Sequence, residues 1–430
     1  MFRVIIGVFF SALLGYALWS RPLDRIGVTP HIIMVVAGLG LGIALQGTEG
    51  LLFDTELLRI AGEFALILAL AVDAARIDIG ALRRTAGLPL RLLGIGLPLT
   101  IVVGTVVAMV VLPGITLLDA LIIATLLAPT DAALGAMVVN SRVVPLRIRQ
   151  ALNVESGLND GLVTPIVLVA VALAGAREEV ADPAWVIDAV AQISLGALAG
   201  VLIGVVGGLS LRLAMARHWM QEGATWIIVP AIAMLAWFVA HEIGGNVFVA
   251  AFVAGLALTA AYGRVPQALL EFADAGGELL GLGVFLLFGT VLSGLGAALS
   301  LSAVLYAALS LTVIRMLPVA IALRGADLRR PTVAFIGWFG PRGLASIVLT
   351  LVALGDGRGV PPFGAEIVAP VALTIALSVI AHGLSAGPAV RRYGNFVSTL
   401  PDEAVENRTT ADLPTRRGVQ QRTIGDQVPT

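Results

Sequence analysis

Two short polar segments interrupt long apolar runs in the first half of the chain, and both carry acids. The first places Thr130 and Asp131 directly after Pro129, and the second contains Glu155 and Asp160. A carboxylate at the centre of a membrane-spanning helix costs about 2.5–3.5 kcal/mol, so acids retained there indicate a functional site. Proline leaves nearby backbone carbonyls without helical partners. Hydroxyl, carboxylate and free carbonyl oxygens together predict a cation site.

Asp160 is the carboxylate that we expect to hold the ion. A carboxylate binds either a proton or a metal cation but not both, and this exclusion is enough to couple the two. Residue 159 is Asn rather than a second acid, so we predict the electroneutral exchange of one proton for one monovalent cation. The alternative is an aspartate paired within the bundle for structure, which the cost of intramembrane acids disfavours.

The residues around Asp160 supply further oxygen atoms. Ser156 lies four positions before Asp160 and Glu155 lies four before Asn159, so a helix places each pair along one face. The hydroxyl groups of Thr130 and Ser156 are hard ligands, and we expect Na⁺ at Asp160, Thr130 and Ser156. Asn159 is expected to support the site by hydrogen bonding.

Other charged residues in apolar segments need partners. We predict that Arg342 pairs with Glu155, because lone buried charges are not tolerated. Asp131 either completes the coordination of the ion or holds an interrupted helix together through hydrogen bonds, and we favour the second role. Arg315 and Asp73 are two further intramembrane charges, and a pairing between them is left open.

The composition places the chain in a membrane. Of its 430 residues, 58% are hydrophobic and only 13% are charged, and apolar runs of about 18 or more residues indicate transmembrane helices in a lipid bilayer. The net charge of −1 excludes a nucleic-acid partner. The chain has no Cys, which excludes disulfide and thiolate chemistry. We expect no cofactor apart from the cation itself.

Thirteen apolar segments are expected to cross the membrane. They cover about 4–19, 30–46, 58–73, 90–112, 117–139, 151–175, 186–211, 224–241, 246–262, 277–296, 299–322, 332–354 and 364–387. Arginines gather in the connections after odd-numbered segments and acids in most of the others, which predicts an external N-terminus and a cytoplasmic C-terminus in the cell (inner) membrane. The polar residues 393–430 are predicted to form a disordered cytoplasmic tail.

Two of these segments are expected to be interrupted, one at Pro129 and the other at Gly340-Pro341-Arg342-Gly343. The segment at about 117–139 and the one at about 332–354 lie an odd number of crossings apart, so they run in opposite directions. Interrupted helices of opposite direction mark a binding site between inverted repeats. We therefore predict an all-α membrane fold in which two interrupted helices cross at mid-membrane, with repeat halves at about 90–175 and 299–387.

The sequence resembles the sodium/proton exchanger superfamily, in its NhaP-like monovalent cation:proton antiporter branch. The Glu-Ser and Asn-Asp pairs at 155–160 are the most specific part of the resemblance. The matching segments are Ala128–Asp131, Glu155–Asp160, Gly255, Phe285–Gly289, Gly340–Gly343 and His382–Gly383.

The resemblance implies an NhaA/NhaP-like antiporter fold over residues 1–392 and a homodimer. A six-helix core would move against a dimerisation domain, at about 1–73 and 186–296, by elevator-like alternating access. The resemblance also places the ion at Asp160. The residues near it would be Asp131, Thr130 and Ser156, with Glu155 bridged through water or held by Arg342.

Two details of the sequence refine the resemblance. The Asn-Asp pair is similar to that of electroneutral members, whereas electrogenic relatives have paired Asp and commonly a core Lys, and this chain has no Lys. Ala132 stands where many relatives have Pro, a departure that bears on ion preference more than on mechanism.

The expected function is therefore the exchange of Na⁺, or Li⁺, for H⁺, as in pH homeostasis, rather than an enzymatic reaction. A K⁺/H⁺ antiporter is the first alternative, and a cation channel or uniporter is the second. An aspartyl protease dyad would need a G-x-G-D signature, but Asn159 occupies its third position.

Overall fold

The computed structural model describes residues 2–45, 55–77, 87–175, 184–296, 299–354, 364–401 and 403–407. Throughout these ranges the regular structure is helical, as predicted. Eight helices among the described residues are long and apolar enough to cross a membrane, and shorter apolar helices lie between them. The chain is therefore an integral membrane protein.

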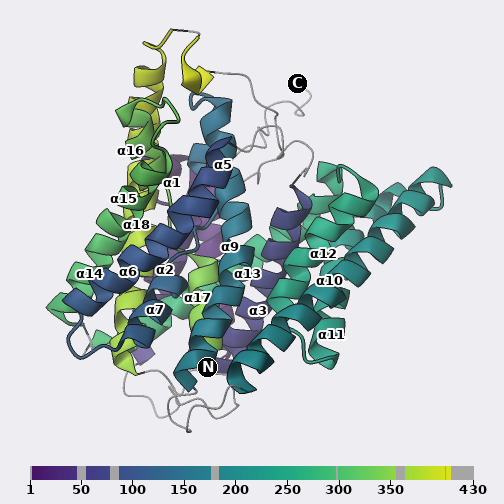
Figure 1. The fold of residues 1–430 in the computed structure, drawn as a ribbon, viewed down its shortest axis with the longest axis horizontal. Helices are drawn as coiled ribbons and strands as arrows, with labels where there is room; N and C mark the ends of the chain where they lie inside the picture. Colours follow the sequence, from purple (N-terminus) through teal and green to yellow (C-terminus); the bar gives the residue numbers. More distant parts are fainter. Residues whose placement is uncertain are drawn as a thin grey trace.

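Each of the thirteen predicted crossings corresponds to one helix or to consecutive helices (Figure 1). In chain order these are α1 (Phe2–Arg25), α2 (Pro30–Leu45), α3 (Thr55–Ala75), α5 with η1 and α6 (Gly87–Arg91, Leu92–Gly96, Leu97–Val111), α7 with α8 (Leu117–Leu126, Ala136–Val139), α9 (Leu146–Gly175), α10 (Ala184–Ala216), η2 with α11 (Glu222–Ile227, Ile228–Glu242), α12 (Val247–Tyr262), α13 (Gln267–Gly294), α14 with α15 (Leu301–Leu311, Val313–Ala322), α16 with α17 (Arg330–Trp338, Leu344–Leu354) and α18 (Ala365–Val397).

The two predicted interruptions are present. The chain leaves helical geometry between α7 and α8 and again between α16 and α17, next to Pro129 and Pro341. The backbone N–H of Asp131 donates to the carbonyl of Pro341 at 2.7 Å, so the two non-helical segments meet directly. This contact confirms the crossing of two interrupted helices.

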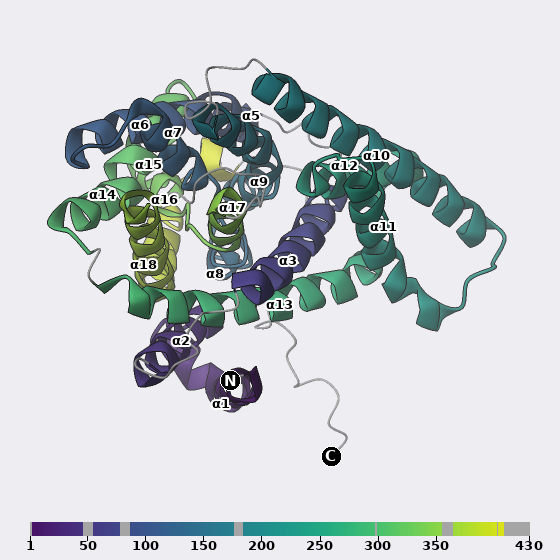
Figure 2. The ribbon, with the colours of Figure 1, turned by 90° about the horizontal axis from the view of Figure 1, so that it is seen from below.

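The helices form two groups joined by α13. Figure 2 shows α10, α11 and α12 on one side of the molecule and α6, α14, α15, α16 and α18 on the other, with α13 running beneath both. The packing of α2 on α13 is close, because a Cβ at Gly38 would overlap the carbonyl oxygen of Leu286. The small residues of α2 therefore serve helix packing.

The prediction that disorder begins at residue 393 is wrong. Tyr393 lies within α18, which continues to Val397, and Val405–Asn407 form a short 3₁₀ helix, η4. The Glu406 side chain is only 1% exposed. It accepts hydrogen bonds from the Arg329 N–H at 2.9 Å and from the Thr332 hydroxyl at 3.0 Å. Because this segment is polar in composition, the sequence alone did not show that Glu406 caps the start of α16. The rest of the predicted tail, 408–430, lies outside the described residues.

Candidate ion-binding site

Asp131 lies where the two interrupted helices cross, and its carboxylate binds backbone N–H groups on both. Oδ1 accepts from Ala133 N–H at 2.8 Å and from Leu134 N–H at 3.3 Å. Oδ2 accepts from Leu344 N–H, the first residue of α17, at 2.8 Å. An anionic group at a helix N-terminus satisfies orphan donors and complements the helix dipole. Asp131 thus stabilises the crossing.

A buried polar cluster joins the first interruption to α9. The hydroxyl oxygens of Thr130 and Ser156 are 3.0 Å apart. Asn159 Nδ2 donates to Thr130 Oγ1 at 2.6 Å. The structure therefore brings together the three residues in a site closed to lipid, with each side chain at most 8% exposed.

Asp160 is on the same helix, one turn after Ser156, and is partly buried. It lines a cavity of about 30 Å³ together with Asp131, Asp73 and Asp274. This volume is enough to hold a water molecule. Asp131 and Asp160 approach the cavity from the first interruption and from α9, whereas Asp73 and Asp274 approach it from α3 and α13.

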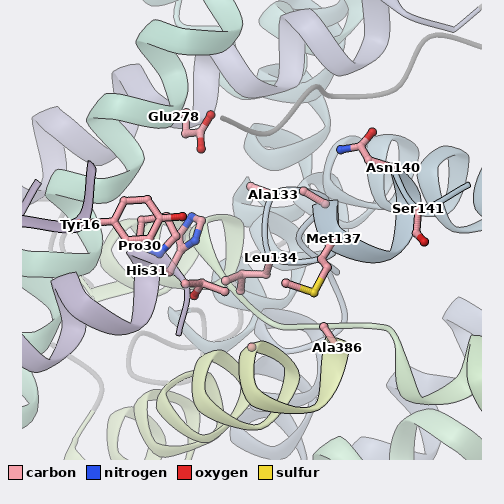
Figure 3. Close-up of a pocket in the computed structure, with 13 residues that line it drawn as sticks. Tyr16, Pro30, His31, Ala133, Leu134, Met137, Asn140, Ser141, Glu278 and Ala386 are labelled. Atoms are coloured by element: carbon pink, nitrogen blue, oxygen red, sulfur yellow. The ribbon is translucent and has the colours of Figure 1, made fainter. Parts of the chain in front are cut away.

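A larger cavity of about 270 Å³ adjoins this one, and the two share His31, Ala133 and Glu278 as lining residues. Figure 3 shows Tyr16 and His31 on one side of the larger cavity and Asn140 and Ser141 on the other. The cavity reaches the connections before α2 and after α8, which belong to the arginine-rich end of the molecule. The cavity that Asp160 lines therefore adjoins a larger cavity that extends toward that end.

The predicted ion pair between Glu155 and Arg342 is wrong, because Glu155 pairs with Arg315 instead. Glu155 Oε1 lies 2.5 Å from Arg315 Nη1, and Oε2 lies 2.9 Å from Nη2. Both side chains are buried. The two parallel contacts form the fork geometry that makes arginine–carboxylate pairs strong and directional.

Arg342 instead binds the carbonyl groups freed after α7. Its Nη1 donates to Ala128 O at 2.9 Å and to Pro129 O at 3.2 Å. Its backbone N–H donates to Ser378 Oγ on α18 at 2.6 Å. Carbonyl groups outside a helix need hydrogen-bond donors when they lie within the membrane. Arg342 supplies such donors, which explains its position.

Asp73 pairs with Arg76 rather than with Arg315. Arg76 Nη1 lies 3.4 Å from Asp73 Oδ1, and its Nη2 lies 2.6 Å from Asp274 Oδ2. This buried triad joins α3 to α13 beside the small cavity. Asp274 was not predicted as a site residue because the predicted crossing began at about 277, whereas α13 begins at Gln267. Glu278 falls within the predicted crossing but was not singled out.

Comparisons with known proteins identify relatives of this chain. A family model described as "Sodium/hydrogen exchanger, transmembrane" matches residues 9–392. The K(+)/H(+) antiporter NhaP2 of Shewanella oneidensis is 25% identical over 398 residues, which are 90% of this chain and 66% of that protein. This chain thus spans slightly less than two thirds of the length of that relative. The Escherichia coli protein YjcE, named an uncharacterized Na(+)/H(+) exchanger, is 34% identical over 215 residues, 46% of this chain and 38% of its own.

The fold also has a close structural counterpart. The sodium proton antiporter MjNhaP1 from Methanocaldococcus jannaschii superposes with a TM-score of 0.69 over 89% of this chain and 99% of its own. The two sequences are 20% identical, so this likeness concerns the fold.

Proposed function

Because the chain belongs to the sodium/hydrogen exchanger family, we propose that it is a secondary transporter exchanging Na⁺, or Li⁺, for H⁺. The observation that carries the proposal is the position of Asp160 on a small acidic cavity beside the crossing of two interrupted helices. Interrupted helices at mid-membrane supply the free backbone groups that transporters use to bind ions.

Asp160 holds either the cation or the proton, and Thr130 and Ser156 offer hydroxyl oxygens to the cation. Their distance of 3.0 Å supports a shared ligand role. Asn159 donates to Thr130 and so orients that hydroxyl. The carboxylate of Asp131 accepts hydrogen bonds from backbone N–H groups. Asp131 therefore positions the ligands, and its negative charge lies near the ion.

The exchange is one cation for one proton. Glu155 is held by two hydrogen bonds from Arg315, and Asp131 is held by three backbone N–H groups. These contacts give both carboxylates a structural role in the bundle and leave Asp160 as the carboxylate that exchanges. Asp160 then carries the proton that exchanges, and no net charge crosses the membrane.

Transport requires the site to face each side in turn. The core, at about 90–175 and 299–387, moves against the scaffold, at about 1–73 and 186–296, in an elevator-like manner. Several of the scaffold residues that line the cavity opposite Asp160 are small, namely Ala69, Ala273, Gly277 and Gly281. The open cavity at the arginine-rich end corresponds to a state facing the cytoplasm. The scaffold also forms the contact of a homodimer.

Exchange of K⁺ for H⁺ is the second candidate. It is favoured by the similarity over 90% of this chain to a protein named a K(+)/H(+) antiporter. The site offers oxygen ligands that both ions accept, so direct measurement decides between them.

Proton flux in proteoliposomes tests the proposal. Cation gradients of Na⁺, Li⁺ or K⁺ should drive proton movement in the wild type, and Asp160→Asn should abolish it. The matched control is Asp188→Asn, which makes the same change at an exposed aspartate on α10 and should leave exchange intact. Exchange retained by Asp160→Asn, or cation flux without proton movement, would contradict the proposal. Net transport driven by a clamped membrane potential would contradict the one-to-one ratio.

A further inference from the structure

A second hollow lies away from the ion-binding site, between α15 and α16. It has a volume of about 860 Å³, within the range of ligand-binding pockets. Apolar side chains form its walls, including Val313, Met316, Leu317 and Val333. Val313 and Leu317 are 45% and 46% exposed, so the groove is open to the surroundings of the bundle. Figure 2 shows α15 and α16 on the side of the molecule away from α10–α12.

One end of this groove is charged. Arg324 and Arg330 line it there, and both are exposed. Asp327 lines the same end, so the lining residues carry a net positive charge. Arg91 Nη1 donates to the carbonyl of Arg324 at 2.6 Å. This contact anchors the turn between α15 and α16 and adds a further guanidinium group beside it.

The orientation of the groove matches a lipid leaflet. Its apolar walls lie along helices of two membrane crossings, and its arginines lie in the connection between those crossings. That connection belongs to the arginine-rich end of the molecule. Arginines at this depth lie at headgroup level, where they attract anionic lipids.

We propose that this groove binds an anionic phospholipid, with the headgroup phosphate at Arg324 and Arg330 and an acyl chain along α15. A soluble anion would gain nothing from the apolar walls, and a neutral lipid would gain nothing from the two arginines.

The groove also adjoins the machinery of the ion-binding site. On α15, Met316 lines the groove, while its neighbour Arg315 binds Glu155 on α9. Met316 also packs against α16, where a Cβ at Gly337 would lie 3.4 Å from its Cα. A lipid in the groove therefore stabilises the packing of α15 on α16 that positions Arg315.

Lipid binding to the purified, delipidated protein tests this proposal. Phosphatidylglycerol should raise the melting temperature by about 2–5 °C, whereas phosphatidylcholine and inorganic phosphate should not. The double substitution Arg324→Gln and Arg330→Gln should weaken phosphatidylglycerol binding, measured by native mass spectrometry, by about thirtyfold. The double substitution Arg391→Gln and Arg392→Gln removes the same charge from exposed positions on α18 and should leave binding unchanged.

A second, neutral variant tests the apolar part of the groove. Ala334 is an exposed lining residue, and Ala334→Trp should fill the groove and displace the acyl chain without changing the charge. If the groove arginine variant and the control arginine variant lost the same amount of phosphatidylglycerol binding, the attraction would be non-specific and the proposal would be overturned. A full rise in melting temperature with inorganic phosphate alone would also overturn it. The proposal would likewise fail if the Ala334→Trp variant still bound lipid but had a changed oligomeric mass.

Discussion

At the scale of single residues, the charges around the site are held by specific partners rather than by general polarity. Glu155 and Arg315 form a buried pair with two hydrogen bonds. Removing one member of such a pair leaves the other buried and uncompensated, which costs about 3–5 kcal/mol. The pair therefore fixes α15 against α9 next to the ion-binding site.

Arg315→Leu should consequently lower the melting temperature of the detergent-solubilised protein strongly, and Glu155→Gln combined with Arg315→Leu should recover part of the loss. Arg217→Ala is the control, because this arginine lies on the surface at the end of α10 over the ring of Trp219. A melting temperature for Arg315→Leu equal to that of the control would refute the pair.

Asp131 and Asp160 line the same cavity but should respond differently to removal of charge. Asp131→Asn can place its NH₂ group against the Leu344 N–H, which loses one contact, or against the N–H groups of Ala133 and Leu134, which loses two. We expect a destabilisation of about 1–3 kcal/mol for Asp131→Asn and little change for Asp160→Asn. Thermal unfolding of both variants checks this contrast, and equal melting temperatures would argue against the positioning role of Asp131.

At the scale of elements, the broken ends of the helices are capped by side chains from elsewhere in the fold. Arg342 donates to the carbonyls that follow α7, and Asp131 accepts from the start of α17. His382 Nε2 lies 2.8 Å from the carbonyl of Trp338, at the end of α16. These contacts let non-helical backbone persist at membrane depth.

The beginning of α16 has a cap as well, and it comes from the chain after α18. Glu406→Ala should leave the Arg329 N–H and the Thr332 hydroxyl without their shared acceptor, at a cost of about 1–2 kcal/mol. The matched control, Glu403→Ala, removes an exposed acid from the same segment. Thermal unfolding distinguishes them, and identical curves would show that the cap contributes nothing.

The sequence predicted the crossings and both interruptions, because long apolar runs and interior Gly and Pro have direct structural consequences. It did not identify the partner of Glu155. Arg315 and Arg342 both lie in apolar segments, and only the three-dimensional course of the chain shows which of them meets freed carbonyls. The start of α13 was missed for a related reason. Glu271 and Asp274 make the stretch before residue 277 look like a loop, whereas Asp274 lines the small acidic cavity.

At the scale of the whole molecule, two groups of helices meet at an acidic cavity. Arg76 joins α3 to α13 on one side of it, and Asp131 joins the two interruptions on the other. Each of these two sides of the cavity is thus held by its own polar contacts. The proposed motion would carry Asp160 together with the interrupted helices.

The central claim is that a proton and a cation compete for Asp160. Isothermal titration calorimetry of Na⁺ binding, repeated in buffers of different ionisation enthalpy, counts the protons released. The account predicts close to one proton per bound cation in the wild type, and no cation-linked proton release in Asp160→Asn. Cation binding to the wild type without proton release, or undiminished release in Asp160→Asn, would contradict it.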